Sequence, residues 1–89
     1  MKQESQEAWV RFVQSPQGDH FRLLHELTRG FVASICVRLR LSEDDIEDTQ
    51  QLVFSQILEL AQDQAAALAL PDINEHIAKL TQTVGGTLK

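Results

Sequence analysis

The residues best able to do chemistry in this 89-residue chain are its acidic side chains, which crowd one short stretch. Five of the thirteen Asp and Glu residues lie between positions 43 and 48, directly after Ser42. A serine oxygen can accept hydrogen bonds from the first free amides of a helix, and negative charge complements the positive end of the helix dipole. Carboxylates that share one helix start do not oppose each other across a cleft. The stretch therefore predicts a capped helix with an acidic surface, not an acid–base pair.

The other reactive side chains form no catalytic or metal-binding pattern. His20 and His25 would lie about 140° apart around a helix, which makes them a poor metal pair, and His76 is isolated. Cys36 is the only cysteine, which excludes an internal disulfide, and its apolar surroundings predict a small buried side chain. The chain has no Gly-rich phosphate loop and no recognisable nucleophile motif. We therefore predict that the chain is not an enzyme and uses no metal or other cofactor.

The elements that position these residues are predicted to be helices. Hydrophobic residues make up 43% of the chain and charged residues 24%, with only four Gly and two Pro. This composition favours a small all-α domain that spans residues 1–89. Apolar periodicity predicts four helices, near residues 5–14, 19–41, 43–62 and 72–84.

Local signals suggest where these helices begin and end. The breaker at residues 15–18 separates the first two helices, and Asp19 is expected to cap the second. Asp72 followed by Glu75 resembles a capping box for the fourth helix. The glycine pair at 85–86 is expected to end that helix.

The second predicted helix is apolar on more than one side, so it should lie at the centre of the fold. Gly30 inside it costs about 1 kcal/mol relative to Ala, which suggests the close approach of another helix. Trp9 is expected to pack in the core rather than to anchor a partner. The residues predicted to be buried together are Phe31, Ile35, Val53, Phe54, Ile57, Ile77 and Leu80.

Charge and hydropathy narrow the possible partners. The net charge is −5, and the arginines are spread over the first two predicted helices without forming a stripe. Proteins that bind duplex DNA alone usually carry a basic patch, so free-standing DNA binding is disfavoured. No apolar stretch approaches the roughly 20 residues that span a bilayer, and the first residues lack a signal-peptide core. These features predict a cytoplasmic protein with no membrane partner.

Two segments resemble a known family. Residues 46–54, IEDTQQLVF, resemble the A-E-D-L-V-Q-E-V-F signature of region two in extracytoplasmic-function sigma factors of bacterial RNA polymerase. Residues 18–27, GDHFRLLHEL, are similar to the G-D-x-x-A-F-x-x-L-Y entry to the preceding helix of that family. The resemblance covers residues 18–60 well and residues 72–89 in outline. It implies a sigma-region-two-like helical domain in a bacterial cytoplasm.

The resemblance also implies a polymerase-binding surface. In this family the acidic and glutamine side of the signature helix docks on the clamp helices of the polymerase β′ subunit. Glu47, Asp48 and Gln51 match that pattern, whereas Leu52 replaces a glutamate. Thr49 and the residue after it replace two usually apolar residues, so the helix should pack less well or turn a polar side inward. The expected polymerase-binding residues are Asp44, Glu47, Asp48, Gln51 and Leu52.

The segment that would read promoter DNA is degenerate. The last region-two helix of the family has the form W-L-x-x-I-A-x-N-x-x-x-D-x-x-R and opens the minus-ten element. Its Trp, Asn, Asp and Arg are absent here, and no aromatic residue follows Phe54. Single-stranded bases are normally held by aromatic stacking and basic side chains. Promoter DNA is therefore expected to be a weak partner at most, contacted by His76, Lys79, Thr83 and Lys89.

Three hypotheses follow from the sequence. The leading one is a sigma-factor-like domain that acts in transcription initiation by binding core RNA polymerase. The alternative is a repurposed sigma-like interaction module that binds a regulator or itself without recognising promoter DNA. The third is an unrelated helical bundle whose similarity to sigma factors is a coincidence.

Overall fold

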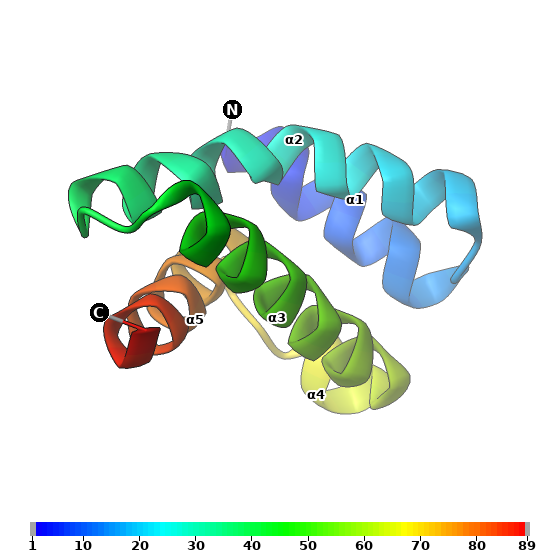
Figure 1. Ribbon diagram of the computed structural model, residues 1–89. Coiled ribbons are helices and arrows are strands. Elements are labelled where there is room, and N and C mark those ends of the chain that lie inside the picture. Colours follow the sequence, from blue (N-terminus) through cyan, green and yellow to red (C-terminus); the bar gives the residue numbers. More distant parts are fainter. Residues whose placement is uncertain (1, 89) are drawn as a thin grey trace.

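A computed structural model describes residues 2–88, which form five helices and contain no strand (Figure 1). The helices are α1 (Lys2–Gln14), α2 (Gly18–Arg38), α3 (Glu43–Gln62), α4 (Gln64–Leu68) and α5 (Ile73–Leu88). The predicted all-α class is confirmed. The helix that was not predicted is α4, a single short turn between α3 and α5.

The helices pack around α2 and α3. A tight turn joins α1 to α2, and α2 returns along α1 (Figure 1). The α5 helix packs across both α2 and α3 (Figure 1). The short α4 continues from the end of α3 and contacts α1. The described part of the chain measures 35 × 21 × 21 Å. None of its helices is long and apolar enough to cross a bilayer.

The core gathers apolar side chains from all five helices. Trp9 is fully buried, as predicted, and its indole Nε1 donates a hydrogen bond to the Ala67 carbonyl over 3.0 Å. This bond ties α1 to α4 and satisfies the polar atom of the largest core side chain. Of the residues predicted to be buried together, five are buried: Ile35, Val53, Phe54, Ile57 and Ile77.

The other two predicted core residues lie at the edge. Leu80 is half-buried against the core, whereas Phe31 is 37% exposed, so its predicted burial is wrong. The buried face of α2 is set by residues that include Thr28, Val32 and Ile35. Phe31 lies about 100° around the helix from Val32 but only about 40° from Ile35, so its side chain stands at the edge of that face. Because apolar residues lie on more than one side of this helix, the sequence pattern did not show whether Phe31 faces the core or the solvent.

The ends of α2 differ from the prediction. Gln17, not Asp19, occupies the N-cap position, and Asp19 lies in the first turn. The helix ends at Arg38 because Arg40 adopts a left-handed conformation with φ 61°. The Leu41 amide then donates to the Cys36 carbonyl and the Arg40 amide to the Val37 carbonyl. This is a Schellman motif with arginine where glycine is usual, so composition did not reveal it.

Glycine roles also differ from the prediction. Gly30 meets nothing within 4 Å of where a Cβ would lie, so no helix approaches it closely. The close approach occurs at Gly85, where an added Cβ would lie 2.9 Å from Leu39 Cδ1 and 3.2 Å from Leu41 Cδ1. The α5 helix continues through both glycines to Leu88, which corrects the predicted end at residue 84. Packing of α5 against the α2–α3 connection explains why Gly85 is tolerated inside a helix.

The glycine assignments predict opposite effects of two substitutions. Gly30→Ala should raise the free energy of unfolding by about 0.5–1 kcal/mol, because alanine is the better helix former and its methyl group meets no neighbour. Gly85→Val should lower it, because the side chain would displace Leu39 and Leu41. Urea unfolding of both variants measures these changes. A lower midpoint for Gly30→Ala would show that α2 is contacted at this position.

Candidate protein-binding surface on α3

The α3 helix begins where the sequence predicted, because Ser42 caps it. The Ser42 Oγ accepts a hydrogen bond from the Asp45 amide over 3.2 Å, and the Ser42 carbonyl accepts one from the Ile46 amide over 2.9 Å. Three acidic residues occupy the first turn, where they complement the helix dipole. The predicted cap is therefore confirmed.

The structure places all five predicted polymerase-binding residues on the exposed side of α3. The opposite side is held in the core by Val53, Phe54 and Ile57. Leu52 is 47% exposed and is the only apolar member of the set. The other four exposed members are Asp44, Glu47, Asp48 and Gln51. We call these five residues the outer α3 face.

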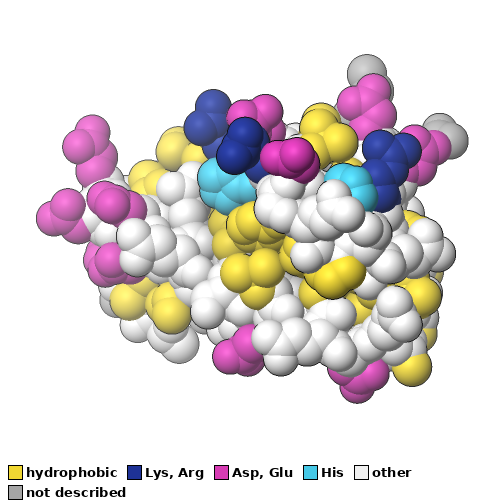
Figure 2. Space-filling model, turned by 90° about the vertical axis from the view of Figure 1, so that its right-hand side faces the viewer, with side chains coloured by type: hydrophobic (Ala, Val, Ile, Leu, Met, Phe, Trp, Pro, Cys, Tyr) yellow, Lys and Arg dark blue, Asp and Glu magenta, His cyan; other side chains and the backbone are white. Residues whose placement is uncertain are grey.

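The carboxylates of the outer α3 face are free to attract a basic partner. Within residues 2–88, Asp44, Glu47 and Asp48 make no ion pair. Figure 2 shows acidic side chains gathered at one edge of the molecule, apart from the basic side chains along the top of the same view. Because the chain also carries a net charge of −5, the outer α3 face lies in a negative field.

Thr49 turns a polar group into the core, as the departure from the sigma signature suggested. Thr28 and Thr81 are also buried, but their hydroxyls donate to carbonyls four residues earlier, over 2.8 and 2.7 Å. The Thr49 Oγ1 has no hydrogen-bond partner in the described part of the chain. Burial raises the pKa of the neighbouring Cys36 thiol. Cys36 is buried, as predicted, and its raised pKa favours the neutral thiol.

Thr49→Val should raise the free energy of unfolding by about 1 kcal/mol. Valine has nearly the same shape as threonine and removes a buried hydroxyl that lacks a partner. Thr28→Val is the matched control, because the Thr28 hydroxyl is satisfied by the Leu24 carbonyl and its removal should give no such gain. Urea unfolding compares the two. If Thr49→Val loses as much stability as Thr28→Val, or more, the Thr49 hydroxyl must have a hydrogen-bond partner.

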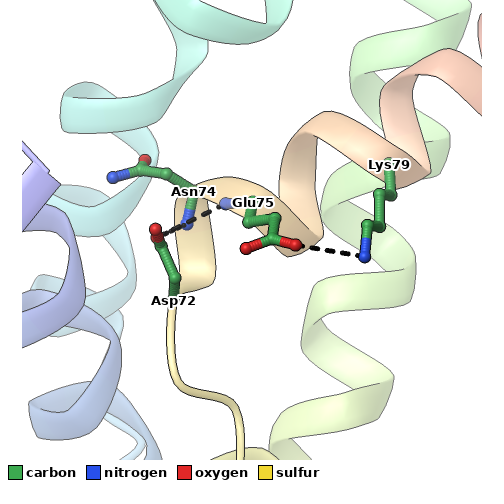
Figure 3. A network of polar contacts seen from close by, with 4 residues as sticks. All are labelled: Asp72, Asn74, Glu75 and Lys79. Carbon is green, nitrogen blue, oxygen red and sulfur yellow. Dashed lines mark hydrogen bonds and ion pairs between the residues drawn. The ribbon is translucent and has the colours of Figure 1, made fainter.

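The start of α5 is capped by Asp72, as predicted. Its Oδ1 accepts hydrogen bonds from the Asn74 amide over 2.9 Å and from the Glu75 amide over 3.4 Å (Figure 3). The Glu75 side chain reaches along the helix to Lys79, with 3.2 Å between Oε1 and Nζ (Figure 3). Lys79 is therefore partly neutralised by its own helix.

The predicted DNA-contacting residues lie together on one side of α5 but form a weakly basic surface. His76 is half-buried, and Lys79 and Thr83 are exposed, while Lys89 lies outside the described residues. Burial lowers the pKa of His76, and the positive charge of Lys79 acts in the same direction. A neutral imidazole beside a paired lysine offers little attraction to phosphate.

A groove between α2 and α3 was not predicted from the sequence. It has a volume of about 390 Å³ and lies beside Glu47 and Gln51, with Phe21, His25 and Leu58 among its lining residues. The His25 ring packs on Phe54 with 4.5 Å between ring centroids. Periodicity shows which residues of one helix share a face, but not the space that two helices leave between them.

Within residues 2–88, no group of three or more His, Cys, Asp or Glu side chains is placed to hold a metal ion. Comparisons of the chain with protein-family models, curated proteins and solved structures found no match. The sigma-like residues 46–54 and the geometry of α3 are the features of the chain that bear on its function.

Proposed function

We propose that this chain is a sigma-factor-like domain that acts in bacterial transcription initiation by binding core RNA polymerase. The proposed contact joins the outer α3 face to the clamp helices of the β′ subunit. The observation that carries the proposal is the division of the sigma-like segment 46–54 between surface and core. Its matched polar residues Glu47, Asp48 and Gln51 are exposed, whereas its apolar Val53 and Phe54 are buried. Such a division is what a docking helix requires.

The outer α3 face has the two components of a contact centre. Its carboxylates would steer a basic helical partner toward the surface and set the orientation of the encounter. Burial of the half-exposed Leu52 would then slow dissociation, because apolar contact excludes water from the centre of an interface. Binding driven in this way weakens as salt concentration rises, since the steering charges are exposed.

Binding to purified bacterial core polymerase tests the proposal directly. A fluorescently labelled chain should show saturable anisotropy on titration with core polymerase, and an intact sigma factor should displace it. Saturable binding that an excess of sigma factor fails to displace would place the contact elsewhere on the polymerase. Absence of binding at micromolar polymerase would refute the proposal.

The second candidate is a sigma-like interaction module that binds a regulator or itself without recognising promoter DNA. The state of α5 favours it: Lys79 is paired with Glu75, and protonation of His76 is disfavoured. Failure to bind polymerase together with a concentration-dependent mass in light scattering would favour this candidate over the first.

Both candidates predict that the isolated chain does not hold promoter DNA. Anisotropy titration against single-stranded minus-ten oligonucleotides at physiological salt should show no sequence-selective binding. The physical reasons are the net charge of −5 and the absence of aromatic residues after Phe54. Tight, selective binding would show that the outer side of α5 reads bases despite its composition.

A further inference from the structure

The surface beside α3 is hollowed at a second place, next to the groove between α2 and α3. A second hollow of about 510 Å³ lies between the end of α1 and the end of α3, and its lining includes Phe12, Pro16, Leu58 and Gln62. Leu58 lines both hollows, which adjoin along α3 and together extend from Glu47 to Gln62. At the rise of an α-helix this stretch is about 22 Å long. We call it the α3 groove.

The floor of the α3 groove is apolar and already packed. Phe12 and Phe21 lie 5.3 Å apart between ring centroids, and Phe21 meets Phe54 edge to face at 6.3 Å. Leu58 stands in the middle with 39% of its surface exposed. Figure 2, seen from the side of the α1–α2 turn, shows apolar side chains reaching the surface in the middle of the face. A preformed apolar floor needs little reordering when a partner binds.

The rim of the α3 groove indicates the charge of its occupant. The α3 rim consists of Glu47, Gln51, Ser55 and Gln62, with further carboxylates just beyond Glu47 at the start of the helix. One end of the α3 rim is therefore acidic, and the rest of this rim is polar but uncharged. A basic group would be favoured at the Glu47 end. The net charge of −5 also attracts a basic partner.

We propose that the α3 groove binds an amphipathic helix of about four turns. Its apolar stripe covers Leu58, and its basic side chains meet Glu47 at the start of α3. The length of the groove suits about 15 residues of helix, and an apolar floor with polar rims is the usual helix-in-groove arrangement. The α3 groove shares Glu47 and Gln51 with the outer α3 face but extends beyond it to Gln62. Its occupancy can be tested apart from polymerase binding, because Asp48 and Leu52 do not line it. Leu52 lies about 120° around α3 from Leu58, so a helix seated on Leu58 does not cover Leu52.

Two synthetic peptides of about 16 residues provide the probe. Both carry leucines at helical spacing, and their polar positions are lysine in one and glutamate in the other. The fluorescein-labelled lysine peptide should bind the full chain at least about tenfold more tightly than the glutamate peptide. Amide chemical shifts of Phe21, His25 and Phe54 should move on titration, because these residues line the groove.

Matched leucine substitutions locate the binding site. Leu58→Gln should weaken binding of the lysine peptide by at least about tenfold. Leu52→Gln and Leu68→Gln replace equally exposed leucines outside the groove and should change the affinity less than about twofold. If urea melts show that Leu58→Gln is unfolded, Ser55→Arg replaces it, because Ser55 is an exposed groove residue where an arginine would obstruct and repel a basic helix.

Three results would overturn the proposal. One is equal binding of the lysine peptide to wild-type protein and to folded groove variants. Another is a set of chemical-shift changes centred on Leu52, or on the exposed α2 residues Leu23 and Phe31, instead of the groove. The third is a concentration-dependent mass of the peptide-free protein that Leu58→Gln abolishes, since the groove would then be covered by a second copy of the chain.

Discussion

Truncation of Phe54 to alanine should lower the free energy of unfolding by about 3–5 kcal/mol. Phe54 is 6% exposed and packs its ring against Phe21 and His25 at the junction of α2 and α3. Removal of the ring loses the free energy gained by burying it and leaves a cavity that two rigid helices cannot close. A domain of this size is stabilised by about 5–10 kcal/mol in total, so the variant should be close to unfolding.

Urea unfolding monitored by the fluorescence of the single tryptophan, Trp9, measures the effect. Leu68→Ala is the control, because Leu68 is an exposed side chain on α4 and its truncation should cost less than about 1 kcal/mol. If Phe54→Ala leaves too little folded protein to analyse, Phe54→Leu should give a smaller loss in the same direction. A near-neutral Phe54→Ala would contradict the packing of α2 on α3.

The parts of the fold that could be predicted from the sequence are those with strong local signals. The predicted range 43–62 agrees with Glu43–Gln62, because Ser42 caps the helix and one apolar stripe runs its whole length. Burial of Trp9 and Ile57 followed from the same periodicity. These features depend on neighbours within one helix, so a single sequence contains them.

The parts that could not be predicted depend on tertiary contacts. Arg40 takes a left-handed conformation that composition assigns to glycine or asparagine, and it ends α2 three residues early. Gly85 lies inside α5 because Leu39 and Leu41 pack against it. A sequence shows that a glycine is present but not whether a neighbour requires it, which is why Gly30 was misjudged.

One part of the candidate site could be predicted from the sequence and the other part could not. Exposure of the outer α3 face followed from helical periodicity, since Asp48 and Gln51 lie opposite Val53. The α3 groove did not, because Phe12, Phe21 and Leu58 come from three different helices. Only their packing shows that they line two adjoining hollows.

Reversal of charge at Asp48 should weaken polymerase binding by about 1–3 kcal/mol or more. Asp48 is exposed on the outer α3 face and is adjacent to Leu52 by helical spacing. In Asp48→Lys, the loss of an attractive pair is combined with new repulsion of a basic partner. The free energy of unfolding should change little, because an exposed charge one turn into a helix contributes only some dipole complementarity.

The decisive measurement is the affinity of core RNA polymerase for wild-type protein, Asp48→Lys and Glu26→Lys under identical salt. Glu26 is an exposed carboxylate on α2, so Glu26→Lys makes the same change in net charge away from the outer α3 face. We predict that wild-type protein and Glu26→Lys bind alike and that Asp48→Lys binds at least about fivefold more weakly. Equal binding of all three proteins, or binding by none, would show that the acidic start of α3 is only a solvated helix surface.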